Sequence, residues 1–170
     1  LGADTLGSRS TAIGAQALEA QNFTSATNAY NVAVGYNAGA TVSTGTNNTL
    51  IGGLAGDAIT TADDTVAIGY LALSTNTTAD DNTAVGSSAL TANTSGRINT
   101  AVGKGSMAAN TEGGDNSAFG GLTLDANTTG DNNTALGYAA LTANTTADNN
   151  TSVGAGSLGA NTTGALNVAV

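Results

Sequence analysis

The stretch from Asn133 to Asn149, Asn-Thr-Ala-Leu-Gly-Tyr-Ala-Ala-Leu-Thr-Ala-Asn-Thr-Thr-Ala-Asp-Asn, is one unit of a repeat that fills most of the chain. Its glycine recurs at intervals of 17 residues, and almost every other position recurs with it. The glycine column consists of Gly35, Gly52, Gly69, Gly86, Gly103, Gly120, Gly137 and Gly154. Because repetition at a fixed period indicates stacked structural units, the chain is predicted to be an array of repeats.

The composition argues against both a compact globule and a disordered chain. The 170 residues include 24 Gly and no Pro, Cys, His or Trp, and only 4% are aromatic, which is poor material for a compact core. Disorder fits badly as well, because 40% of the residues are hydrophobic and only 9% are charged. The apolar residues instead occupy fixed columns of the repeat.

The charge and the hydropathy pattern exclude two classes of partner. The formal net charge of -9 repels phosphate backbones and anionic membrane surfaces, so no nucleic-acid partner is expected. No apolar run approaches the length of a membrane span, so no membrane insertion is expected either.

The repeat divides the chain into two parts. Residues 1–30 are irregular, because Gly14 lies 21 residues before Gly35, four more than the period, and a looped-out turn is predicted between Glu19 and Tyr30. Residues 31–170 keep one register throughout, as a solenoid requires. Both ends of the sequence fall inside repeats, so the chain is expected to be a piece of a longer fibrous protein.

The predicted fold is an all-β parallel β-solenoid with coils of 17 residues, each built from two strands and two turns. β-branched residues alternate with Gly, Thr and Asn, which favours strands over helices, and the absence of proline suits coils that donate hydrogen bonds on both sides. The bulky residue before each glycine and the leucine column of the second strand are predicted to fill the interior. Val102 and Leu141 represent these two inward columns.

The same alternation predicts an alanine stripe on the outside of the first strand. Its members include Ala84, Ala101, Ala118 and Ala135. A smooth stripe along a rod with a thin core lets a second chain approach closely. This predicts that parallel chains associate with the alanines near a common axis, and the alternative is a monomeric β-helix whose alanines face water.

Two asparagine columns follow the same period. The first contains Asn76, Asn93, Asn110, Asn127, Asn144 and Asn161, and the second contains Asn82, Asn99, Asn116, Asn133, Asn150 and Asn167. Stacked amides can hydrogen-bond along the axis, so both columns are interpreted as structural ladders. Several members of the first column head Asn-x-Ser/Thr sequons, which leaves a glycan on each coil as the alternative.

Aspartates recur at one turn, where stacking brings like charges together. They are Asp63, Asp80, Asp131 and Asp148 in one column, beside Asp64, Asp81 and Asp115 in the next. One hypothesis is that these carboxylates bind calcium, which would relieve the repulsion between them. The alternative is that they are solvated turn residues bonded to local backbone. Arg97 follows Asp80 by one coil and is expected to relieve its charge.

Catalysis has little support in the sequence. There is no His or Cys, the carboxylates recur in turns, and no lysine follows the glycines as in a phosphate-binding loop. The chain is therefore not expected to be an enzyme or to hold a cofactor.

The motif Asn-Thr-Ala-Val-Gly at residues 82–86 and 99–103, with Asn-Thr-Ala-Leu-Gly at 133–137, resembles the head repeats of trimeric autotransporter adhesins. Those repeats are shorter and form left-handed parallel β-rolls with three chains around an axis. The full unit, with its Ala-Leu and Ala-Asn-Thr-Thr-Gly parts, is similar to repeats of long phage tail fibres and related bacterial surface fibres. The resemblance covers residues 31–170 and implies that the chains predicted to associate along the alanine stripe form a parallel homotrimer.

The leading hypothesis is a structural and adhesive fibre segment, extracellular on a cell surface or virion, that holds a receptor-binding tip away from its base. Receptor contact would then fall to regions outside this segment. A second hypothesis is an ice-binding solenoid, suggested by the threonine ladder Thr77, Thr94, Thr111, Thr128, Thr145 and Thr162. A second threonine follows directly in several coils, at Thr78, Thr129, Thr146 and Thr163, and two adjacent residues of a regular strand would point to opposite faces.

Overall fold

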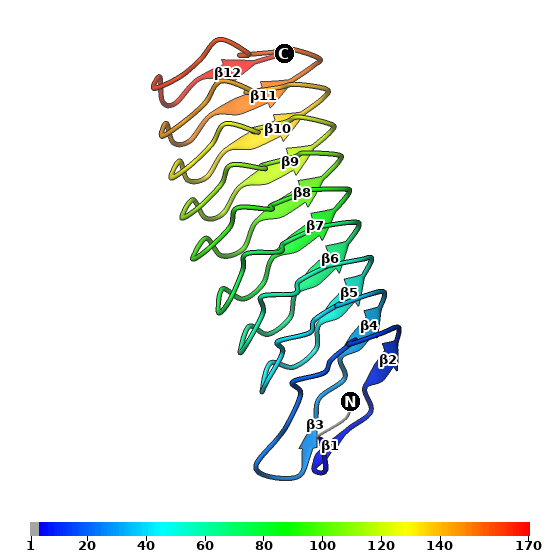
Figure 1. The fold of residues 1–170 in the computed structure, drawn as a ribbon. Helices are drawn as coiled ribbons and strands as arrows, with labels where there is room; N and C mark the ends of the chain where they lie inside the picture. The colour runs from blue at the N-terminus through cyan, green and yellow to red at the C-terminus, as the bar shows by residue number, and fades with distance from the viewer. Residues whose placement is uncertain (1–3) are drawn as a thin grey trace.

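The computed structural model describes residues 4–170 and shows an all-β parallel β-solenoid, as the repeat predicts. Its ten-stranded parallel sheet runs along one side of an elongated stack of coils, from β2 near the N-terminal end to β12 at the other (Figure 1). The strands are β2 (Thr11–Ile13), β4 (Val32–Val34), β5 (Thr49–Ile51), β6 (Val66–Ile68), β7 (Thr83–Val85), β8 (Thr100–Val102), β9 (Ser117–Phe119), β10 (Thr134–Leu136), β11 (Thr151–Val153) and β12 (Val168–Ala169).

The register of the sheet follows the sequence period. Thr83 pairs with Thr100, and Val85 pairs with Val102, so equivalent residues of successive coils lie side by side. At a parallel-strand spacing of about 4.8 Å, the ten strands extend about 43 Å along the axis. The glycine after each strand makes the corner: Gly120 has a φ of 137°, and a Cβ there would lie 2.6 Å from the carbonyl oxygen of Gly137. Both the backbone conformation and the close approach therefore require glycine.

The side of each coil opposite the sheet is not the second strand that the sequence predicted. It consists of consecutive turns in which non-glycine residues adopt left-handed backbone conformations, such as Ser88 with a φ of 59° and Leu90 with a φ of 50°. A left-handed conformation costs an L-residue roughly 1–2 kcal/mol. Complete burial of the Leu90 side chain, which stabilises by about 1.5–3 kcal/mol, offsets that cost.

The interior corrects the predicted inward and outward columns of the strand. Ala101 and its equivalents are fully buried, whereas Thr100 and Val102 on either side are half-buried and point outward. The prediction that Val102 points inward is therefore wrong, and the prediction for Leu141, which is fully buried, is confirmed. The alanine stripe of Ala84, Ala101, Ala118 and Ala135 lies inside each coil and cannot face a trimer axis.

Space explains this correction. In the coils of β6 to β10 the turns already place one leucine or methionine and two asparagine side chains inside, which leaves room for only a small residue on the strand. Leu50 is the exception that shows the constraint. It occupies the alanine column, and glycines replace the facing leucines: a Cβ on Gly39 would lie 2.5 Å from Leu50 Cδ1, and one on Gly56 would lie 2.8 Å from Leu50 Cδ2.

The two asparagine columns form buried ladders, as predicted. In the first, Asn127 Nδ2 donates to Asn110 Oδ1 at 2.8 Å and to the carbonyl oxygen of Gly130 at 3.0 Å. In the second, Asn116 Oδ1 accepts hydrogen bonds from the backbone N–H of Asn133 at 2.9 Å and from its Nδ2 at 3.2 Å. In both ladders the hydrogen bonds between asparagines run from one coil to the Oδ1 atom of the preceding coil.

The first coil differs from the others. The described part of residues 1–30 contains β1 (Gly7–Ser8) and β3 (Thr27–Asn28), which pair in a separate two-stranded parallel sheet at the N-terminal end of the stack (Figure 1). Residues 1–3 of that predicted segment lie outside the described residues.

The column of the second asparagine ladder is interrupted at Thr65, continues with Asn48 and Asn31, and meets the first coil at Asn31. Asn31 Nδ2 donates to Gln21 Oε1 at 2.9 Å, and Gln21 Nε2 donates to Asp4 Oδ2 at 2.5 Å. Burial would raise the pKa of the Asp4 carboxyl, but hydrogen bonds from Gln21 and from the backbone of Gly7 and Leu6 outweigh it and hold that pKa below its usual value. The carboxylate of Asp4 therefore accepts the last hydrogen bond of the series that runs from Asn31 through Gln21.

Candidate functional site

The most distinctive surface is the outward face of the ten-stranded sheet, which we call the sheet face. It consists of the first and third residues of each strand, because the middle residue is buried. The first position carries Thr, Val or Ser, and the third carries Ile, Val, Phe or Leu. Phe119 is 42% exposed and Leu136 is 49% exposed, so bulky apolar side chains stand in water along this face.

The sheet face is free of charge. Neither outward column contains Asp, Glu, Lys or Arg, although the chain carries a net charge of -9. The face covers roughly 400 Å², from a length of about 43 Å and a width of about 10 Å for two side-chain columns. The third-position column, which is entirely apolar, makes up about half of that area, and contiguous apolar surface of this kind commonly marks interaction sites.

Threonine hydroxyls add a second chemistry to the sheet face. Those of Thr83 and Thr100 have no hydrogen-bond partner within residues 4–170, and strand alternation directs them outward. The threonines predicted to form an ice-binding ladder lie elsewhere, at a turn. There Thr128 Oγ1 donates to the carbonyl oxygen of Thr145 at 3.0 Å, so this ladder is bonded to backbone and presents no free hydroxyl array.

Three tyrosines border the sheet face at the glycine corner. Tyr36, Tyr70 and Tyr138 occupy the position after the glycine, which we call the tyrosine column although other coils carry Gly, Ser, Lys or Ala there, and Tyr138 is 62% exposed. A Cβ on Gly121, one coil before Tyr138, would lie 3.6 Å from the Cδ2 of that ring. The tyrosine therefore lies over the glycine of the preceding coil and extends the apolar surface around the corner.

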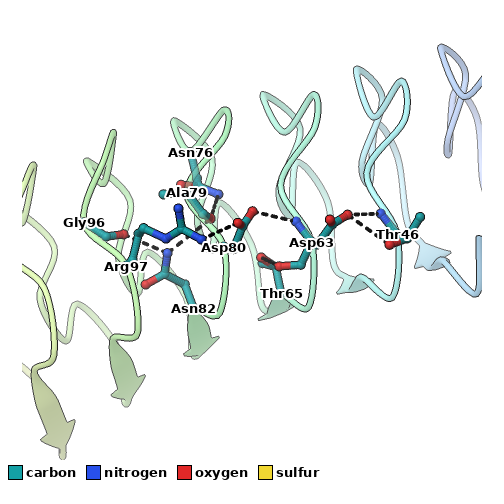
Figure 2. Close-up of polar contacts among 9 residues, drawn as sticks. All are labelled: Thr46, Asp63, Thr65, Asn76, Ala79, Asp80, Asn82, Gly96 and Arg97. Atoms are coloured by element: carbon teal, nitrogen blue, oxygen red, sulfur yellow. Dashed lines mark hydrogen bonds and ion pairs between the residues drawn. The ribbon is translucent and has the colours of Figure 1, made fainter.

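Acidic residues border the sheet face on its other side, at the turn before each strand. Figure 2 shows four residues of this column, Thr46, Asp63, Asp80 and Arg97, in successive coils. Asp63 Oδ1 accepts hydrogen bonds from the backbone N–H of Thr46 at 2.6 Å and from its hydroxyl at 3.0 Å. Asp80 Oδ1 accepts one from the backbone N–H of Asp63 at 2.9 Å, and Arg97 pairs with its other oxygen. The predicted pair of Asp80 and Arg97 is thereby confirmed, with a contribution of at most about 1 kcal/mol at this exposed position.

The remaining calcium candidates have similar structural roles. Asp131 Oδ1 accepts from the backbone N–H of Gly114 at 2.7 Å, and Asp148 Oδ1 accepts from that of Asp131 at 2.8 Å. Asp64 and Asp81 adopt left-handed conformations, with φ of 54° and 62°, which aspartate tolerates better than most residues. Within residues 4–170, no three acidic side chains form a group that could hold a metal ion.

Four of the five sequon asparagines in the first asparagine column do not present their nitrogen atoms to solvent, whereas Asn161 at the last coil is half-buried. Asn76, Asn93, Asn127 and Asn144 are fully buried, and their Nδ2 atoms donate to main-chain carbonyl oxygens. A glycan on these nitrogens is incompatible with the folded coil. In the part of the chain that the structure describes, no helix is long and apolar enough to span a membrane.

Sequence reasoning missed the sheet face because it placed the residue before glycine inside. One signal could have revealed it. Where Leu50 replaces alanine in the strand, Gly56 replaces leucine in the same coil, and this exchange of volumes indicates that the two columns face each other across the interior.

The fold and this face define the chain as a β-solenoid of about ten parallel turns with one long uncharged side. Comparisons with protein-family models, with curated proteins and with solved structures give no match. The function is therefore argued from the surface itself.

Proposed function

We propose that this chain is a rigid segment of an extracellular adhesive fibre, on a cell surface or a virion, in which identical chains associate in parallel along the sheet face. The observation that supports this most strongly is the uncharged, partly apolar face running the length of the sheet. The segment acts as a spacer, catalyses no reaction, and leaves receptor contact to other parts of the fibre.

Charge supports a second copy of the same chain as the occupant of the face. Two chains of net charge -9 repel each other, and the acidic corner intensifies this repulsion locally. The sheet face offers a route of approach without like charges. Each coil adds a similar pair of outward residues, so the association free energy grows with the number of stacked coils.

The proposed number of three chains comes from the resemblance of Asn-Thr-Ala-Val-Gly to the repeats of trimeric autotransporter adhesins. The corrected burial pattern changes which residues would lie at the axis. Val102, Phe119 and Leu136 take the place of the alanines. A solenoid shaft suits a fibre because the number of coils sets its length.

Two matched charge substitutions test the interface. Val102→Asp places a carboxylate on the sheet face, and Ser95→Asp places one at an exposed turn tip away from it. Sedimentation velocity at equal chain concentration should show dissociation for Val102→Asp alone. Equal sedimentation of the two variants as one associated species would contradict the proposal.

Ice binding remains a second candidate, now on a different surface. The free hydroxyls of Thr83 and Thr100 stand in a parallel sheet with a repeat of about 4.8 Å, and a regular array of this kind could order water. The larger side chains of Phe119 and Leu136 interrupt that array. Thermal hysteresis in a solution of the purified single chain would favour this candidate, and its absence would remove it.

A further inference from the structure

Stacking identical coils creates a difficulty for any assembly along the sheet face. The motif Asn-Thr-Ala-Val-Gly occurs identically at residues 82–86 and 99–103, so β7 and β8 present the same outward pair, Thr and Val. The strands β4 to β6 and β11 also carry only Thr, Val or Ile at their outward positions, so a copy displaced by one coil would meet side chains of similar size there. Most of the face therefore sets no unique register between chains.

One coil departs from this uniformity. Phe119 is the only aromatic residue at the outward positions of β2 and β4 to β12, and it is 42% exposed. Small residues flank it: Ser117 stands at the outward position otherwise held by Thr or Val, and Gly121 stands in the tyrosine column. The next coil carries Leu136 in place of the valine of β7 and β8.

We propose that Phe119, with the small residues beside it, fixes the register in which copies of this chain associate along the sheet face, a proposal that rests on the self-association proposed above. In register, the phenylalanines of all copies meet at one level, where ring contacts add to the burial of apolar area. Displacement by one coil places Phe119 against Val102 or Leu136 of the neighbour, in space fitted to smaller side chains. Overpacking of this kind is unfavourable enough to reduce the displaced population by about tenfold or more.

Cysteine cross-linking of the full chain tests the register, because the sequence contains no other cysteine. Chains with Thr83→Cys and with Thr100→Cys are mixed in equal amounts, associated and oxidised. Disulfides require Cα atoms about 4.4–6.8 Å apart, so same-residue products report association in register, whereas the 83–100 product requires a displacement of one coil. The pair Val85→Cys and Val102→Cys repeats the measurement in the second outward column.

The register variant is Ser117→Thr with Phe119→Val, which gives β9 the outward residues of β7 and β8 and thereby carries little risk to folding. We expect its 83–100 product to rise about tenfold over that of chains retaining Phe119. Ile68→Val is the matched control, since it also replaces a larger outward residue by valine, as in Val85 of the next coil, but retains Phe119, and its product ratio should not change.

Each outcome decides between the two proposals. An unchanged product ratio in the register variant overturns the role of Phe119 and leaves self-association intact. An associated particle without same-residue products in either column overturns assembly in register. A mass of one chain, measured by light scattering, overturns the self-association and the register proposal together.

Discussion

Replacing Asn127 by alanine should destabilise the solenoid through the amide ladder in its interior. Asn127 Nδ2 donates to Asn110 Oδ1 at 2.8 Å and to the carbonyl oxygen of Gly130 at 3.0 Å, and its Oδ1 accepts from Asn144 Nδ2 at 3.0 Å. The substitution removes all three hydrogen bonds from a fully buried site.

The expected magnitude follows from what the partners retain. The Gly130 carbonyl keeps a hydrogen bond from Asn116 at 2.8 Å, and Asn144 keeps its bond to the carbonyl oxygen of Ala147 at 3.0 Å. Asn110 Oδ1 alone loses its donor and stays buried. Three hydrogen bonds of about 1 kcal/mol each, one of them leaving a buried acceptor unpaired, give a loss of about 3 kcal/mol in the free energy of unfolding.

Urea unfolding at one fixed chain concentration, followed by circular dichroism and by hydrogen exchange of the peptides around residue 127, measures this loss. Asn161→Ala is the matched control in the same column. Its amide is only half-buried and makes bonds of 3.2 Å and 2.8 Å at the last described coil, so its loss should be smaller. Equal effects of Asn127→Ala, Asn161→Ala and the surface change Ser87→Ala would refute the ladder as a source of stability.

Two further substitutions test backbone strain and burial. Ser88→Gly should stabilise by about 0.5–1 kcal/mol in urea unfolding, because Ser88 has a φ of 59° and glycine adopts this conformation without a steric penalty, whereas Ser87→Gly should destabilise by a similar amount. Burial raises the pKa of the Asp57 carboxyl, whose Oδ1 has no hydrogen-bond partner, so the folded chain binds this proton more tightly than the unfolded chain does. The free energy of unfolding should then fall as the pH rises through the window just above the ordinary aspartate pKa. Asp57→Asn should flatten that fall, and an identical pH profile in the variant would contradict the raised pKa of Asp57.

The period of the sequence was sufficient to predict the coil, the pairing of equivalent residues and the columns that form ladders. These properties depend on repetition alone, because any residue that recurs every 17 positions must stack on its equivalents. The place of Asn127 in an amide ladder and the place of Gly120 in the glycine column follow from this repetition.

The direction of the strand side chains could not be predicted with the same rules. Alternation shows that Ala101 and Val102 lie on opposite faces, and hydrophobicity favours the larger residue inside. The interior is too narrow for that choice, and its width depends on the turns opposite the sheet. Those turns place residues such as Leu90 in left-handed conformations, which intrinsic preferences of L-residues argue against.

The mass of the unmodified chain in solution tests the proposed association along the sheet face most directly. Light scattering across a range of chain concentrations should give three times the chain mass of 16.2 kDa, and Val102→Asp should reduce it to that of one chain. A mass of one chain for the unmodified protein at every concentration would contradict the proposal, because the sheet face would then be exposed to water along its whole length.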